Sequence, residues 1–401
     1  MGEQVFWKNI RDWRHARILP HICVAAYGLA CFYLYYRQSV ADLTAETILY
    51  QSDLPLHISM VVEDGWMYSF TAIAYRVLYQ IFQGTLGIAV FLAVCSAGTV
   101  YATERLVTQL GSWKKGAGTL FLALSLNFVM PAYVPFIGEF RYVSYQSPNI
   151  WHNSTYICMR LAALLTLSLY FTLEGTYREG LTAKQWLGFA LMNVLATGIK
   201  PSFLLAFSPI MGICLLWDLL TDKKLPFYRI LLFGSALLPS GLVLLWQNSV
   251  LFGEETGNGI AFDPWYTFSL HTNIPKLAVV CSALFCGLTV LCTLKDIFAP
   301  AQKRYRFLIA MAALGFLEAL CLVEKGSRSV DGNFLWGYSF CLFTLFIITA
   351  VKALSLKPLA ADGRKKTARV LRAGLLLVYG YHLYCGIYFF IRLLTGETFW
   401  M

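Results

Sequence analysis

The stretch Ile18–Tyr36 reads ILPHICVAAYGLACFYLYY and contains no Asp, Glu, Lys or Arg from end to end. A helix rises about 1.5 Å per residue, so about 20 apolar residues cross the hydrocarbon core of a bilayer. Strands of a membrane-spanning barrel would instead show short segments of alternating apolar and polar residues. The continuous run therefore predicts a transmembrane helix.

Similar runs recur along the 401 residues, of which 13% are charged and 58% hydrophobic. A soluble domain carries about 25% charged residues. The composition predicts an all-α, polytopic membrane helix bundle that forms one domain over residues 1–401, with no separate soluble domain. We expect about eleven transmembrane helices, at residues 18–36, 84–102, 117–135, 155–175, 185–199, 203–220, 230–246, 277–294, 307–323, 335–354 and 373–393.

The basic residues that precede the first run resemble the leader of a signal peptide; they are Lys8, Arg11, Arg14 and Arg17. Because the run continues to Tyr36, we interpret it as an uncleaved anchor, with cleavage after Gly28 or Ala30 as the alternative. The 11 cysteines lie in or beside apolar runs, with no CxxC or metal-ligand spacing, and are interpreted as small core residues.

The charged residues predict an orientation. A cytosolic N-terminus puts most of the 32 Lys and Arg residues on inner segments, as the positive-inside rule requires, and puts the C-terminus outside. Inner basic residues suit anionic lipid headgroups, so the net charge of +10 predicts no nucleic-acid partner. The outer face becomes acidic, with Asp42, Glu46, Asp53, Glu63, Asp64, Glu139, Glu254, Glu255, Asp263, Glu324, Asp331 and Glu397.

Two outer segments, 37–83 and 247–276, are longer than simple turns. In the first, apolar residues recur at spacings of three and four over 54–62 and 70–81. That period predicts two amphipathic helices lying in the membrane interface. Further along, the short fifth run ends at Gly198-Ile199-Lys200-Pro201-Ser202, which suggests a pair of half-buried helices. A break at membrane depth must pack on protein or line a wet cavity, so we expect Lys200 to border a cavity.

Asp53 and His57 are the first candidates for chemistry. In Ser52-Asp53-Leu54-Pro55, either Ser52 or Asp53 can cap a helix whose first turn tolerates Pro55. Asp53 and His57 then lie four residues apart on one face. One interpretation makes Asp53 a general base, with His57 orienting it or binding substrate. The other makes Asp53 a helix cap and His57 an interfacial side chain.

A second group of candidates lies between residues 139 and 160. Trp151 is explained as a membrane-interface aromatic residue and Pro148-Asn149 as a turn. Asn153-Ser154-Thr155 is also a formal glycosylation sequon. The remaining polar side chains are candidates for substrate binding: Arg141, His152, Asn153 and Arg160.

The third group follows Glu318, an acid within an apolar run. The sequence from Glu324 to Gly337 supplies a planar guanidinium for phosphate in Arg328 and a donor and acceptor in Asn333. An acid inside a membrane costs roughly 2 to 3 kcal/mol unless it is paired or neutralised, which favours a functional role. The alternative is an internal ion-pair network among Glu318, Glu324, Lys325 and Arg328.

The order of these features resembles the GT-C class of membrane glycosyltransferases, which use polyprenyl-phosphate sugars on the outer or lumenal face. The likeness consists of a cytosolic N-terminus, a long first outer loop with two interfacial helices, an acid near its start (Asp53) and a later arginine turn (Arg328). The segments 147–153 and 332–337 look like those of uncharacterised bacterial multi-span proteins of surface-polysaccharide synthesis.

The resemblance implies roles for particular residues. Asp53 would be the base, and Arg328 with Lys200 or Arg160 would neutralise the departing phosphate. No metal and no cofactor is required by that scheme. Many members of the class have paired acids in the first loop, whereas here His57 follows Asp53 and the pair Glu63-Asp64 lies further on.

These features predict an enzyme that moves a sugar from a polyprenyl-phosphate carrier to a cell-surface glycan or lipid acceptor, with inversion at the anomeric carbon. The expected partners are membrane lipids, the lipid-linked sugar and the acceptor. The expected location is a bacterial plasma membrane, although an endoplasmic reticulum protein would look similar. One alternative is a transporter or flippase of a lipid-linked or anionic substrate, which usually shows matching broken helices in two halves. Another is a non-catalytic membrane subunit.

Overall fold

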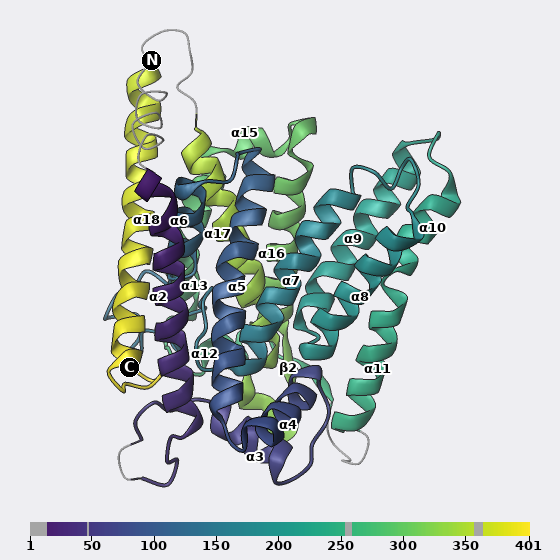
Figure 1. Ribbon diagram of the computed structural model, residues 1–401. Helices are drawn as coiled ribbons and strands as arrows, with labels where there is room; N and C mark the ends of the chain where they lie inside the picture. Colours follow the sequence, from purple (N-terminus) through teal and green to yellow (C-terminus); the bar gives the residue numbers. More distant parts are fainter. Residues whose placement is uncertain (1–13, 46–47, 253–258, 357–363) are drawn as a thin grey trace.

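A computed structural model describes residues 14–45, 48–252, 259–356 and 364–401, and shows a bundle of long helices (Figure 1). Lys8, Arg11, Glu46, Glu254 and Glu255, which entered the predicted charge distribution, lie outside the described residues. The α-helices are α2 Arg14–Ser39, α3 Leu54–Val62, α4 Phe70–Phe82, α5 Leu86–Gly111, α6 Ala117–Leu126, α7 Ser154–Leu173, α8 Ala183–Ile199, α9 Ser202–Thr221, α10 Phe227–Ser235, α11 Leu238–Phe252, α12 Tyr266–Ser269, α13 Pro275–Ser282, α14 Leu284–Cys292, α15 Leu294–Ile297, α16 Lys303–Cys321, α17 Asn333–Ser355 and α18 Arg364–Leu394.

Seven helical segments in the described part of the chain are long and apolar enough to cross a membrane, and the bent pair α13 and α14 would make eight. These helices and the composition indicate an integral membrane protein. The predicted count of about eleven is not confirmed, because α6 has 10 residues, α8 has 17, and α16, with 19, begins at Lys303-Arg304-Tyr305-Arg306. The short fifth run is one helix, α8, followed by a full-length α9.

The first long connection contains the two helices that its periodicity predicts. Helix α3 has Pro55 in its first turn, where a missing backbone N–H is tolerated. Helix α4 begins after Ser69, whose side chain accepts a hydrogen bond from the Ala72 backbone N–H. Both helices lie across one end of the bundle, which we call the α3–α4 end (Figure 1).

The predicted helix over 117–135 is wrong in its second half, because α6 ends at Leu126. Asn149, far along the chain, donates from its side-chain amide to the carbonyl oxygens of Leu126 and Val129 at 2.9 and 2.8 Å. A helix end buried in an apolar interior needs such donors for its unpaired carbonyls. Hydropathy could not locate this end, because the residues directly after Leu126 are as apolar as those of the helix itself.

Two short strands position the third candidate group. Strand β1 (Ile260–Phe262) pairs antiparallel with β2 (Leu322–Glu324), with Ile260 opposite Glu324. The pairing holds the backbone of the segment directly after α16 in place. A 3-10 turn, Gly326–Asp331, then leads into α17. Gly332 joins them with a φ of 60°, a conformation that glycine adopts without steric strain.

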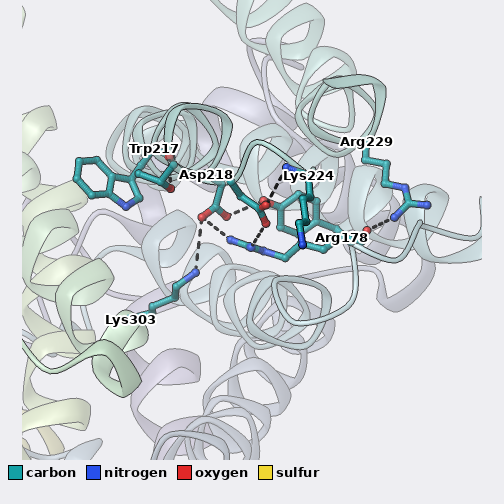
Figure 2. A network of polar contacts seen from close by, with 9 residues as sticks. Arg178, Trp217, Asp218, Lys224, Arg229 and Lys303 are labelled. Carbon is teal, nitrogen blue, oxygen red and sulfur yellow. Dashed lines mark hydrogen bonds and ion pairs between the residues drawn. The ribbon is translucent and has the colours of Figure 1, made fainter. Parts of the chain in front are cut away.

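An ionic network joins the helices at the opposite end of the bundle (Figure 2). Arg178 contacts Asp218 of α9 at 2.5 Å and Asp222 at 2.8 Å, and Lys303 of α16 lies 3.6 Å from Asp218. Tyr177 donates a further hydrogen bond to Asp218 at 2.6 Å. These contacts connect the chain after α7 to α9 and α16, away from the α3–α4 end.

The fold predicts that residues 63 and 330 are accessible from one side of the membrane and residue 223 from the other. In a cysteine-free variant, Glu63→Cys and Val330→Cys should react with a membrane-impermeant maleimide added to one face. Lys223→Cys should react only from the opposite face. Reaction of residues 63 and 330 from opposite faces would contradict the arrangement.

Candidate functional site

A cavity of about 720 Å³ lies at the α3–α4 end. Its walls come from seven separate parts of the chain, and they include three carboxylates, a lysine, an arginine and three histidines. The lining charged and imidazole side chains are Asp53, His57, His152, Lys200, His271, Glu324, Arg328 and Asp331. The folded chain therefore gathers most of its candidate residues in one place.

Asp53 occupies the N-cap position of α3, but its carboxylate makes no capping hydrogen bond. The Leu54 backbone N–H is bound instead by Ser52 Oγ at 3.2 Å. Asp53 Oδ2 accepts a hydrogen bond of 2.7 Å from Asn153 Nδ2. Helix capping thus does not account for the Asp53 carboxylate, which is half-buried in the cavity wall.

Asn153 has two functions at once. Its Oδ1 accepts from the Tyr156 backbone N–H at 2.9 Å and so caps α7, which leaves Nδ2 to hold Asp53. The Asp53 backbone N–H donates to the His152 carbonyl at 3.2 Å, a second link between the same two segments. The capping role of Asn153 explains why the amide is fixed in orientation.

His57 donates its backbone N–H to the Asp53 carbonyl at 2.9 Å, but its imidazole is bound elsewhere. Its Nδ1 lies 3.0 Å from Ser154 Oγ, at the first turn of α7. Desolvation lowers the pKa of His57 to about 4, against an opposing contribution from the Asp53 charge. The imidazole is therefore neutral near pH 7, which suits it to hydrogen bonding rather than to holding a proton.

Lys200 lies in the turn between α8 and α9, where the residue before Pro201 is extended as expected. Its Nζ donates to Thr155 Oγ1 at 3.2 Å and lies 5.1 Å from the centre of the Trp336 ring. Desolvation lowers the pKa of this amine to about 8, although the Asp53 charge acts in the opposite direction. Within the described ranges, no carboxylate lies within ion-pair distance of Lys200.

Arg328 is ion-paired within its own turn. Its Nε lies 2.8 Å from Glu324 Oε2, and Asp331 is 3.8 Å away. Asn333 Nδ2 donates to the same Glu324 oxygen at 2.8 Å, while Asn333 Oδ1 accepts from Trp336 Nε1 at 3.2 Å. Part of the alternative ion-pair network therefore exists, but without Glu318, which makes no ion pair in the described part of the chain.

The other side of the cavity is aromatic. His152 stacks on Phe399, with ring centroids 4.3 Å apart and planes 20° apart. Tyr142 meets the His152 ring edge to face at 4.7 Å. Trp400 lies against Phe399 at 5.2 Å and against His271 at 5.2 Å. Residues 398–401 were not among the candidates, since terminal aromatic side chains carry no sequence signal that separates cavity walls from lipid contacts.

Asp53 is close to both the charged and the aromatic groups of the cavity. Its charge raises the pKa of His152 and of Lys200, against the larger effect of desolvation. Trp336 also lies near both groups, because its ring is 6.0 Å from that of His152 and 5.1 Å from Lys200 Nζ. We call the part of the cavity around Lys200 and Arg328 the charged end, and the part around Phe399 and Trp400 the aromatic end.

Two predicted substrate-binding residues lie outside the cavity lining. Arg141 packs its guanidinium on the rings of Tyr133 and Tyr388, at 4.0 and 4.5 Å from their centres. Arg160 is 1% exposed and donates to Asn149 Oδ1 and, at 3.2 Å, to Asn127 Oδ1. Arg160 therefore anchors the two buried ends of the irregular segment 127–153, whose middle reaches the surface at Phe136. The cavity contains Lys200 and Arg328 as its long cationic side chains.

Comparisons with known proteins found a similarity to a solved structure and no match by sequence. No protein-family model and no curated protein matches the chain. Among solved structures, the apo oligosaccharyltransferase of Archaeoglobus fulgidus aligns with a TM-score of 0.42 and 10% sequence identity. The alignment covers 92% of this chain and 56% of that one, so the chain spans about half the length of that enzyme. A likeness of this size carries no argument about activity.

The position of Arg160 predicts a structural role. Arg160→Leu would leave Asn127 Oδ1 and Asn149 Oδ1 buried without donors, at roughly 1 to 3 kcal/mol for each acceptor. We expect a clearly lower melting temperature in detergent, measured by differential scanning fluorimetry. Arg141→Leu is the matched control. The contacts of the Arg141 guanidinium with aromatic rings are of a kind that stabilises a protein by only about 0.5 to 1 kcal/mol at an exposed site. Equal melting temperatures for the two variants would contradict the assignment.

The lowered pKa of Lys200 predicts pH-dependent anion binding. The ammonium is protonated below its pKa of about 8 and loses its charge above it. Affinity for farnesyl phosphate should therefore fall between pH 7 and pH 9, measured by isothermal titration calorimetry in detergent. Lys200→Arg keeps its charge over this range because arginine titrates above about pH 12, so its affinity should stay level. The same profile in both proteins would refute a phosphate contact at Lys200.

Proposed function

We propose that this chain is a membrane glycosyltransferase that moves a sugar from a polyprenyl-phosphate carrier to a glycan or lipid acceptor. The observation that carries the proposal is the Lys200 ammonium, which faces the same cavity as the Asp53 carboxylate and has no ion-pair partner among the described residues. The proposal does not depend on the structural neighbour described above.

An unpaired cation surrounded by protein is costly, because desolvation is not offset by an opposite charge. The ion pairs at the other end of the bundle show the contrast, since Arg178 there contacts two carboxylates. A bound anion would supply the missing partner of Lys200. A phosphate group at this position would also be attracted by the positive charge of Arg328, which is close enough to lower the pKa of Lys200.

Asp53 can serve as the base of a displacement at the anomeric carbon. It takes the proton of an acceptor hydroxyl while the acceptor oxygen forms a bond to the anomeric carbon. The bond from that carbon to the phosphate oxygen breaks, and the lipid phosphate leaves with one more negative charge. Lys200 and Arg328 stabilise that charge, and the configuration inverts because attack and departure occur on opposite faces.

The cavity wall also provides a place for a lipid chain to enter. The apolar side chains of Leu56 and Met60 in α3, Trp66, and Leu244 in α11 line it. Leu56 is 56% exposed and Trp66 43% exposed, so this part of the wall is also molecular surface. An isoprenoid tail can lie across these apolar side chains while its phosphate reaches Lys200.

Replacement of the base tests the proposal. Asp53→Asn keeps an acceptor for Asn153 Nδ2 but cannot take a proton, so transfer should fall by about 10² to 10⁴ fold. Purified protein in nanodiscs would be given a set of undecaprenyl-phosphate sugars with membrane glycolipid extract, and labelled product would be measured.

Asp64→Asn is the matched control, because Asp64 is exposed on the same connection but is absent from the cavity lining. It should retain wild-type turnover. Equal turnover in the Asp53 and Asp64 variants would remove Asp53 as the base. Movement of the intact lipid-linked sugar between leaflets, with no transferred product, would favour the transporter in place of the enzyme.

A further inference from the structure

The aromatic end of the cavity combines rigid ring faces with two polar atoms, the Tyr142 hydroxyl oxygen and Gln146 Nε2, that make no hydrogen bond within the described residues. Tyr142 is held by ring contacts with His152, Phe389 and Phe399, at centroid distances of 4.7, 6.0 and 6.3 Å. In the part of the chain that the structure describes, its hydroxyl makes no hydrogen bond, although the residue lines the cavity.

Gln146 provides a second polar group of the same kind. The side chain is 4% exposed and lines the cavity. Its Oε1 accepts from Ser282 Oγ at 3.2 Å, and the same hydroxyl receives the Gln146 backbone N–H at 3.0 Å. The single Ser282 hydroxyl proton is shared with the Ala278 carbonyl, 2.7 Å away. Gln146 Nε2 donates to no group in the described residues, and as part of the cavity wall it can donate to a ligand.

Trp400 supplies an exposed ring. It is held by Phe140, His271 and Phe399, at centroid distances of 5.8, 5.2 and 5.2 Å, yet 37% of its surface remains accessible. An indole that is both fixed and partly uncovered at a cavity wall offers a flat surface with little loss of conformational entropy on binding.

The chemistry of this end excludes two classes of ligand. Arg141, the cation next to Tyr142 in sequence, packs on Tyr133 and Tyr388 and does not line the cavity, so an anion here would depend on the more distant contacts of the charged end. A hydrocarbon would leave the Tyr142 hydroxyl and Gln146 Nε2 without partners. A neutral sugar ring fits both requirements, because its C–H face stacks on an aromatic ring and its hydroxyl groups bind polar side chains.

We propose that Tyr142, Gln146 and Trp400 form the acceptor subsite, and that they bind a neutral pyranose of a glycan acceptor. This inference rests on the proposed function and deepens it by choosing a glycan over a lipid acceptor. The sugar stacks on Trp400, receives a hydrogen bond from Gln146 Nε2 and contacts the Tyr142 hydroxyl. Its free hydroxyl then points toward Asp53, which lines the same cavity.

Saccharide binding without donor is the first test. Wild-type protein in nanodiscs would be titrated with maltotriose, chitotriose and a rhamnose trisaccharide, and saturation-transfer difference NMR would report binding. We expect at least one trisaccharide to bind, with the dissociation constant raised roughly tenfold in Trp400→Ala. Trp400→Tyr should restore most of the affinity, which separates stacking from a folding defect.

Trp246→Ala is the matched control for the loss of an indole. Trp246 is 37% exposed, as Trp400 is, but it is absent from the cavity lining. Its replacement should therefore leave saccharide affinity unchanged. Binding of none of the three trisaccharides, or equal weakening by Trp246→Ala and Trp400→Ala, would overturn the subsite.

Transfer kinetics distinguish failure of the subsite from failure of the proposed function. With donor present, Trp400→Ala and Gln146→Leu should raise the acceptor KM several fold and leave affinity for farnesyl phosphate unchanged. An unchanged acceptor KM in an active enzyme would refute the subsite alone. Saccharide binding in a protein whose Asp53→Asn variant transfers normally would refute Asp53 as the base and leave the subsite intact.

Discussion

The site depends on how Arg160 and Asn149 hold an irregular segment inside the bundle. Backbone groups in an apolar interior must find partners within the protein. Asn149 closes the end of α6, and Arg160 binds both Asn149 and Asn127. The chain can then leave the helix at Leu126, reach the surface at Phe136 and return to the interior before Asn153, which caps α7 and holds Asp53. Without this support, Asp53 would have no fixed orientation.

The protein satisfies its charges differently at its two ends. Arg178, Asp218 and Lys303 form a matched network that joins three parts of the chain and does not line the cavity at the α3–α4 end. At the α3–α4 end, Glu324 is shared by Arg328 and Asn333, whereas Lys200 has only a threonine hydroxyl and a tryptophan face. The difference indicates that the second arrangement is completed by a ligand.

The cavity holds the three kinds of group that the proposed reaction needs. They are the Lys200 cation, the Asp53 carboxylate and the aromatic wall that includes Trp400. A displacement with inversion needs the leaving group and the incoming oxygen on opposite faces of the sugar, and positioning of both reactants lowers the barrier substantially. In the proposed arrangement the donor phosphate binds at Lys200, the acceptor sugar binds at Trp400, and Asp53 takes the acceptor proton.

The sequence by itself determined the helical membrane architecture, the helices α3 and α4, and the candidates Asp53, Lys200 and Arg328, because isolated charges are costly in a membrane and stand out in apolar runs. Tertiary structure alone decided that Arg160 binds Asn127, that Arg141 packs on Tyr388, and that Trp400 lines the cavity. Hydropathy and periodicity are local properties. The direction in which a polar or aromatic side chain points depends on partners far along the chain, and a ring that faces lipid has the same composition as one that faces a cavity.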